Sequence, residues 1–237
     1  MGRIRDIHPV RCLLPGKFTG GLVVDFCPFL CYHYYTGDNM DAIDNILEVY
    51  WKSNQAEHES GLAFYPRALD YCTGLAAAHN LGLESVVGAC AVLSPGLNWK
   101  VNRIALEGII ALHLDGLDVI NTHNPAYRAN RVKAVQCLDG DLSALHGNKV
   151  TAFYQDILTG GESERVTIDR WAAAAALGSR HGSWIHPALY RRLESAYQTA
   201  AEHLGLHGAG LQAIVWLVVQ RLSNVWSYRV NLNFAGG

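Results

Sequence analysis

Hydrophobic residues recur at three- and four-residue spacing along most of the chain after residue 37. The first such series contains Ile43, Ile46, Leu47, Tyr50 and Trp51, and Asp38 or Asn39 precedes it as a capping residue. This spacing places the apolar side chains on one face of an α-helix. The same period predicts further helices, which cover residues 60–79, 84–93, 98–114, 128–137, 149–158, 169–177, 187–204 and 209–222.

Helix boundaries are marked by residues that favour helix ends. Gly178 and Gly205 are suited to the position after a helix, and Pro187 is suited to a first turn. Residues 1–37 contain several glycines and prolines, which predict an irregular N-terminal arm. At the other end, residues 225–234 alternate weakly between apolar and polar, which fits either a strand or a segment packed on the core.

Composition limits the class of protein. The chain has 237 residues, half of them hydrophobic, so its length fits one domain of two lobes or two small domains. Charged residues make up 17% and the formal net charge is −2, so any contact with nucleic acid has to come from a local patch. The best apolar run, residues 211–219, is too short to cross a membrane, and no membrane partner is expected.

The six cysteines show no regular spacing. Together with the lack of a secretory signal, this indicates reduced thiols and a cytoplasmic location, which is the host cytoplasm if a bacteriophage encodes the protein. Cys27, Cys31 and His33 are close enough in sequence to suggest a metal site. No second ligand pair follows at zinc-like spacing, so buried or neighbouring thiols are the preferred interpretation, with no metal and no cofactor.

A glycine-centred turn delivers a lysine to the start of a predicted helix. Gly147 and Asn148 precede Lys149, and the backbone N–H groups of such a turn can hold a phosphate. Taken alone, Lys149 is interpreted as an exposed lysine at the start of a helix. If its amine instead lies in a cleft, burial lowers its pKa and makes it a nucleophile.

An aspartate opens the alanine-rich helix that follows. Asp169 precedes Arg170 and Trp171, and taken alone it is a helix cap. The same position also suits catalysis, because a carboxylate interacts favourably with the helix dipole and can stabilise a cationic sugar transition state.

A short turn joins two apolar helices and carries polar and aromatic side chains. Ser94, Asn98 and Trp99 belong to this turn. Trp99 fits the hydrophobic core, and it equally fits a site that stacks on an extruded base. Gln212, on the last long helix, is a further candidate for the same cleft.

Four segments together resemble the helix-hairpin-helix DNA glycosylases, the superfamily of endonuclease III and the adenine and 8-oxoguanine glycosylases. The resemblance covers roughly residues 84–178. The segments are Glu84-Ser-Val-Val-Gly-Ala-Cys-Ala-Val-Leu-Ser94, Tyr127-Arg-Ala-Asn-Arg-Val-Lys-Ala134, Leu145-His-Gly-Asn-Lys149 and Val166-Thr-Ile-Asp-Arg-Trp-Ala-Ala173. No cysteine follows Cys137, so the resemblance does not extend to a C-terminal iron–sulfur cluster.

This resemblance implies an all-α, two-lobed helix-hairpin-helix glycosylase-like fold with the active cleft between the lobes. One lobe combines residues 38–83 with 166–237, and the other comprises 84–165 with the hairpin. The implied function is cleavage of the N-glycosidic bond of a flipped base in DNA, with Asp169 as the catalytic carboxylate and Lys149 as the amine. The remaining candidates for contact with DNA or base are Gly147, Asn148, Ser94, Asn98, Trp99, Arg170, Trp171 and Gln212.

Two alternatives stay open. The chain also resembles small bacteriophage proteins with "A-L-S-P…W…N", "G-x-K-V-x-x-F-Y" and "V-T-I-D-R" segments, some of whose glycosylase-fold relatives transfer an amine or amino acid to a modified thymine. That activity requires a small amine co-substrate. The other alternative is a non-catalytic module of the same fold that binds DNA or protein.

Overall fold

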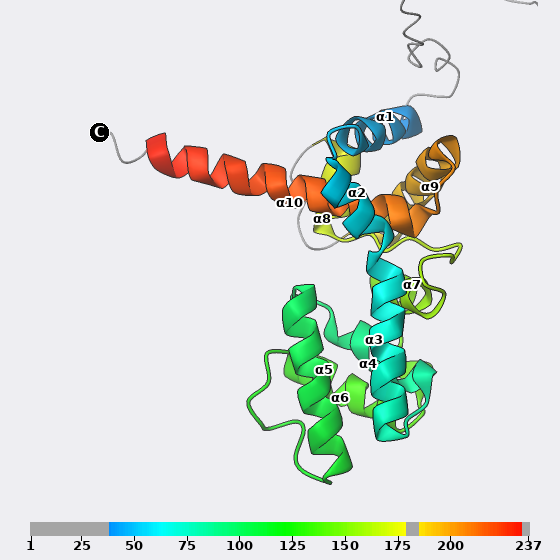
Figure 1. The fold of residues 1–237 in the computed structure, drawn as a ribbon, viewed down its shortest axis with the longest axis vertical. Coiled ribbons are helices and arrows are strands. Elements are labelled where there is room, and N and C mark those ends of the chain that lie inside the picture. The colour runs from blue at the N-terminus through cyan, green and yellow to red at the C-terminus, as the bar shows by residue number, and fades with distance from the viewer. Residues whose placement is uncertain (1–37, 179–184, 234–237) are drawn as a thin grey trace, which may run out of the picture. The chain divides into compact units, whose positions relative to one another are not determined.

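Helices make up the regular structure of the described part of the chain. The computed structural model describes residues 38–178 and 185–233, and within these ranges it contains α-helices, one short 3-10 turn and no β-strand (Figure 1). The expectation of an all-α protein is therefore confirmed for this part of the chain. The helices are α1 (Asp38–Tyr50), α2 (Gln55–Leu62), α3 (Phe64–His79), α4 (Leu83–Leu93), α5 (Trp99–Leu114), α6 (Arg128–Leu138), α7 (Asn148–Leu158), α8 (Arg170–Leu177), α9 (Pro187–Leu204) and α10 (Gly208–Asn233).

Local hydrogen bonds explain where several helices begin and end. The Asn98 side chain accepts a hydrogen bond from the Val101 N–H at 3.0 Å and thereby starts α5. Gly178 and Gly205 follow α8 and α9 with φ of 64° and 67°, as expected for C-terminal glycines. Pro187 lies in the first turn of α9.

The helix expected over residues 60–79 is in fact two helices. α2 ends at Leu62 and α3 begins at Phe64. Pro66 explains the break, because its ring nitrogen has no hydrogen to donate to the Leu62 carbonyl, so the proline is accommodated in the first turn of a new helix. α2 starts earlier than expected because Asn54 and Glu57 form a reciprocal capping box.

Of the two expectations for residues 225–234, a strand or a segment packed on the core, the strand is wrong for the backbone up to Asn233. These residues continue α10, which runs from Gly208 to Asn233. No glycine or proline occurs between Gly210 and Gly236, so no residue in this stretch interrupts the helical hydrogen bonds.

Buried side chains form two hydrophobic clusters. One is built mainly by α3, α4, α5, α6 and α7, in which α4 packs against each of the other four. The second is built mainly by α1, α8, α9 and α10, which contact one another pairwise. Figure 1 shows α3 and α7 within the first group and α2 next to α10 of the second. In the part of the chain that the structure describes, no helix is both long and apolar enough to span a membrane.

The contact between α2 and α10 is close because it is made through a glycine. A Cβ atom on Gly61 would lie 2.7 Å from Cα of Ile214, whereas one on Gly74 of α3 would meet no atom within 4 Å. We therefore expect Gly61→Ala to lower the free energy of unfolding by about 1–3 kcal/mol through overpacking. Gly74→Ala, the matched control, should raise it by about 0.5–1 kcal/mol. Urea unfolding of both variants tests this, and equal effects would contradict the close approach.

Candidate functional site

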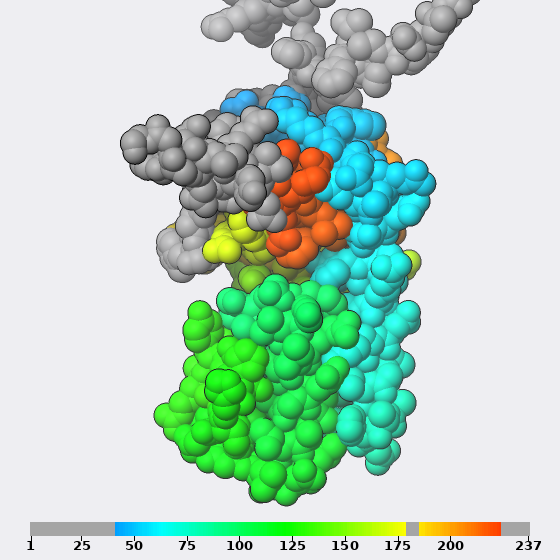
Figure 2. Space-filling view, turned by 60° about the vertical axis from the view of Figure 1, so that its left-hand side comes forward, coloured from blue at the N-terminus to red at the C-terminus, as the bar shows by residue number. Residues whose placement is uncertain are grey.

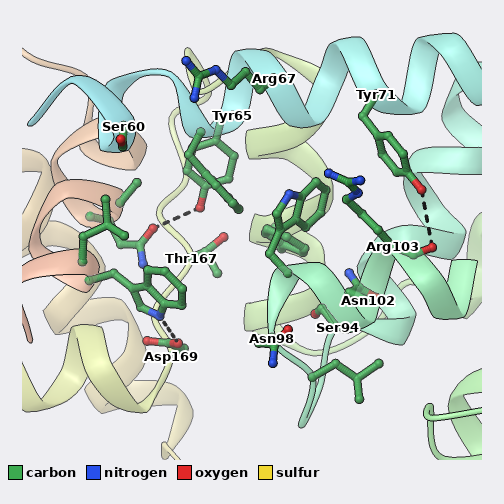
Figure 3. A pocket seen from close by; sticks show the side chains of 18 of the residues that line it. Ser60, Tyr65, Arg67, Tyr71, Ser94, Asn98, Asn102, Arg103, Thr167 and Asp169 are labelled. Atoms are coloured by element: carbon green, nitrogen blue, oxygen red, sulfur yellow. Dashed lines mark hydrogen bonds between the residues drawn. The ribbon is translucent and has the colours of Figure 1, made fainter. Parts of the chain in front are cut away.

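A pocket of about 480 Å³ lies among segments that are far apart in the sequence (Figure 3). Its walls come from α2 and α3, the turn between α4 and α5, the start of α5, α7, the segment before α8, and α10. Figure 2 shows the orange surface of α10 next to the cyan surface of α2 and α3, with the green surface that includes α5 below them. The lining residues that carry the argument below are Phe64, Tyr65, Ser94, Asn98, Trp99, Asn102, Lys149, Thr167, Asp169, Gln212 and Trp216.

Asp169 is held at the N-terminus of α8 by three hydrogen bonds. Its Oδ1 accepts from the backbone N–H groups of Trp171 and Ala172, each at 2.9 Å. Its Oδ2 accepts from the indole Nε1 of Trp216 on α10 at 3.2 Å, as the dashed line in Figure 3 shows. The carboxylate is therefore both a helix cap and a fixed negative group on the pocket wall. The cap and the pocket position do not exclude each other.

The chain before Asp169 is held by buried side chains instead of by a neighbouring strand. Asp156 of α7 is fully buried and accepts hydrogen bonds from the N–H and Oγ1 of Thr167, at 3.0 and 2.6 Å. The hydroxyl of Tyr190 accepts from the Ile168 N–H and donates to the Val166 carbonyl, at 3.0 and 2.8 Å. Asp169 is thus positioned by contacts from α7 and α9.

Burial also changes the proton affinity of Asp156. Burial raises its pKa from 3.8 to about 6, although the hydrogen bonds from Ser163 and Thr167 act in the opposite direction. The charge of Glu194 contributes to the increase. The group that fixes the backbone next to Asp169 therefore changes its charge near neutral pH.

Asp156→Asn is expected to remove a pH-dependent component of stability. Between pH 3.8 and about 6 the folded protein binds the Asp156 proton and the unfolded chain does not. The contribution of Asp156 to the free energy of unfolding should therefore fall by roughly 3 kcal/mol as pH rises through this window. Urea unfolding below and above the window measures this fall, which Asp156→Asn should lack. Asp70→Asn, at an exposed position on α3, is the control, and a fall of equal size in both variants would count against this assignment.

Lys149 lines the same pocket from the first turn of α7. Burial lowers the pKa of its amine below the ordinary value of 10.5, while the charge of Asp169 opposes that effect and the charge of Arg170 adds to it. Among the described residues, Lys149 has no hydrogen bond and no salt bridge within 4.0 Å. The pocket thus contains an amine that is not committed to a structural ion pair and that interacts electrostatically with Asp169.

The opposite wall is aromatic. Trp99 packs edge-on against Phe64 and Tyr71, with ring centroids 5.4 and 6.0 Å apart. The guanidinium of Arg103 lies 4.8 Å from the centroid of the Tyr71 ring. These rings give the pocket an apolar face of the type that takes a planar ligand.

Tyr65 and Gln212 join the two sides of the pocket. The Tyr65 hydroxyl donates to Oε1 of Gln212 at 3.0 Å, and both residues are buried (Figure 3). Burial keeps the pKa of Tyr65 well above 10, so this hydroxyl acts as a hydrogen-bond donor and not as an anion. The turn at Gly161, with φ of 92°, lies close to the Tyr65 side chain, because a Cβ atom on this glycine would come within 3.2 Å of Cβ of Tyr65.

Six of the ten residues singled out from the sequence line this one pocket. They are Asp169, Lys149, Ser94, Asn98, Trp99 and Gln212. The other four do not line it. Gly147 precedes α7 with φ of 88°, Asn148 begins that helix, and the guanidinium of the exposed Arg170 lies over the Trp171 ring. Sequence reasoning missed Tyr65, Asn102, Asp156 and Trp216. Asn102 ends the "A-L-S-P…W…N" segment but was not placed in the site, and no local motif distinguishes the other three residues, whose roles depend on contacts between separate elements.

The described residues offer no obvious place for a metal ion. Within residues 38–178 and 185–233, no three His, Cys, Asp or Glu side chains are grouped as metal ligands. Cys72, Cys90 and Cys137 are buried free thiols. The suggested group of Cys27, Cys31 and His33, together with Cys12 and the N-terminal arm, lies outside the described residues.

Fold and site together define an all-α protein with a fixed carboxylate and a partly buried amine in one aromatic-walled pocket. Residues 35–223 match a family described as "Family of unknown function (DUF7178)", and the chain belongs to that family. No curated protein and no solved structure matches the chain.

Proposed function

We propose that this protein is a DNA N-glycosylase that acts on a base extruded from the helix into the pocket. The observation that carries the proposal is the joint placement of Asp169 and Lys149 on the pocket wall. Asp169 is oriented by two backbone N–H groups and the Trp216 indole, so its carboxylate needs no rearrangement to act on a developing positive charge.

The proposed reaction breaks the bond between C1′ of the deoxyribose and the base nitrogen. The base leaves with the bonding electrons, and positive charge develops on C1′ and the ring oxygen. The Asp169 carboxylate stabilises this charge and accepts a proton from the water that adds to C1′. The free base takes up a proton, so the products are a base and an intact strand with an abasic site.

The pocket has properties that suit a base. Its volume of about 480 Å³ lies within the usual range for small-molecule sites of roughly 300–1,000 Å³. Phe64 and Trp99 offer ring faces and edges for contact with a planar heterocycle. Arg67 and Arg103, exposed residues of the lining, supply positive charge for the phosphates that flank an extruded nucleotide.

The proposal includes a helix-hairpin-helix arrangement of two lobes. It is supported by the two hydrophobic clusters and by the chain between α6 and α7, where a 3-10 turn (Leu142–Ala144) and Gly147 separate the helices. The backbone at Gly147 has a positive φ, which glycine adopts without steric cost. In this proposal the N–H groups that open α7 face a DNA phosphate.

The test is incubation with single- and double-stranded oligonucleotides that carry a panel of modified and mismatched bases. Mass spectrometry detects free base, and alkali cleaves the strand at an abasic site. Base release by the wild type and its loss in Asp169→Asn would support the proposal. An intact strand that gains mass only when an amine or amino acid is supplied would instead support transfer to the base. Unchanged oligonucleotides throughout would overturn the enzymatic proposal in favour of a binding module.

A further inference from the structure

Two polar atoms in the pocket wall have no hydrogen-bond partner within the described protein. They are Oγ of Ser94 and Oδ1 of Asn102. Ser94 is 7% exposed and Asn102 is 2% exposed, yet both residues line the pocket (Figure 3). A buried polar group without a partner costs about 1–3 kcal/mol, so such groups are rare unless a ligand completes them.

The orientation of the Asn102 amide follows from its other contacts. Its Nδ2 donates to the Cys90 carbonyl at 3.1 Å. A carbonyl oxygen can only accept a hydrogen bond, so the amide atom that faces it has to be the nitrogen. Oδ1 is therefore the free atom, and it can only accept a hydrogen bond. The hydroxyl of Ser94 can either donate or accept. A ligand that satisfies both atoms presents an N–H group to Asn102 and a second polar atom to Ser94.

We propose that Ser94 and Asn102 read the polar edge of the extruded base and select bases that carry an unsubstituted N–H on that edge. This inference rests on the proposed function, because it assumes that the pocket takes a nucleobase. The ring N–H of uracil or hypoxanthine and the amino group of adenine or cytosine have the required chemistry. A base alkylated on the same nitrogen leaves Oδ1 without a partner and is rejected.

Neighbouring residues support the assignment of this wall to the base. Trp99 begins α5, three residues before Asn102, and borders the same pocket. Phe64 and Tyr71 hold its ring edge-on from α3. An aromatic surface beside polar atoms that lack partners is the combination by which a flipped base is bound, through stacking and contacts to its edge.

The first test uses Ser94→Ala, which removes a hydroxyl with no partner and leaves the backbone bond from Ser94 N–H to Ala91 in place. We expect the variant to unfold at the same or a higher temperature than the wild type, since a buried group without a partner is lost. We also expect it to bind base about tenfold more weakly. Ser195→Ala, on the exposed face of α9, is the control and should change neither property.

The second test measures binding of free bases to Asp169→Asn by saturation-transfer NMR. The probes are uracil, hypoxanthine, adenine and cytosine, each beside the analogue whose edge nitrogen is fully methylated. At least one parent base should bind about tenfold more tightly than its methylated partner, and Asn102→Leu should abolish the difference. Asn102→Asp retains an acceptor oxygen and should preserve part of the difference.

The possible results separate this inference from the proposed function. If the methylated and parent bases bind equally, or if no base binds, the inference is overturned. Selective binding by a wild type that releases no base would support the inference and overturn the glycosylase. Base release without selectivity for N–H would support the glycosylase and overturn the inference. Loss of binding in Ser94→Ala together with a lower unfolding temperature would indicate a structural role and would also overturn the inference.

Discussion

Asp169→Asn is expected to reduce base release by at least about a hundredfold to a thousandfold while leaving the protein folded. The loss follows because the neutral amide cannot balance a developing positive charge or accept a proton from water. The fold should survive because asparagine caps a helix about as well as aspartate, so the free energy of unfolding should change by less than about 1 kcal/mol. Single-turnover base release and thermal unfolding, measured on the same preparation, test both parts.

Asp169→Ala separates the two roles of this residue. It removes both the charge and the acceptor for the Trp171 and Ala172 N–H groups. We expect a similar loss of activity and an additional loss of about 1 kcal/mol of stability. If Asp169→Asn retained wild-type base release, the carboxylate would be only a cap and the proposed mechanism would be wrong.

Lys149→Gln is expected to abolish covalent trapping on DNA that contains an abasic site. In the trapping reaction the amine attacks C1′ of the ring-opened sugar, one water molecule leaves and an imine forms. Borohydride then delivers hydride to the imine carbon and leaves a stable amine link between protein and DNA. Lys100→Gln, at an exposed position on α5, is the control and should trap like the wild type. Gel electrophoresis of the crosslinked species measures the outcome.

The pH profile of trapping gives a second, independent measure. The neutral amine is the nucleophile, and burial lowers the pKa of Lys149 below 10.5. Trapping should therefore rise with pH and reach its half-maximum below the pH at which an ordinary lysine loses its proton. A midpoint at or above the ordinary value, or trapping that persists in Lys149→Gln, would show that another amine reacts. Lys149 would then be a charge stabiliser in the pocket.

Much of the helical architecture was accessible from the sequence because apolar spacing and caps are local signals. Residues 187–204 carry a proline at the start, a glycine after the end and an apolar face between them, and these are the observed bounds of α9. Two expectations were wrong where a local signal was misread. Pro66 was placed inside a helix although it marks the start of one, and the weak alternation after residue 224 was given more weight than the absence of any helix-breaking residue.

The site was accessible only in part. Asp169 and Lys149 could be singled out because a helix cap and a glycine turn are recognisable in the sequence. Both residues line the pocket in the structure. Trp216 lies 47 residues from Asp169 in the sequence, and Tyr65 lies 147 residues from Gln212. Such pairings depend on how α3, α8 and α10 pack, and no spacing rule connects the partners. The buried Asp156 also has no sequence feature that marks it as a site residue, because its role is to hold the backbone before Asp169.

The five alanines of α8 have a consequence for how this site tolerates sequence change. Ala172, Ala173, Ala175 and Ala176 are buried, and α8 packs against α1, α9 and α10 through them. A larger side chain at any of these positions would displace α8 from one of these three helices and shift the Asp169 carboxylate relative to the Trp216 indole. Residues that never touch a ligand therefore restrict where the carboxylate can lie. A chain with the same chemistry should carry a run of small residues directly after its aspartate, while the residues at the pocket mouth remain free to vary.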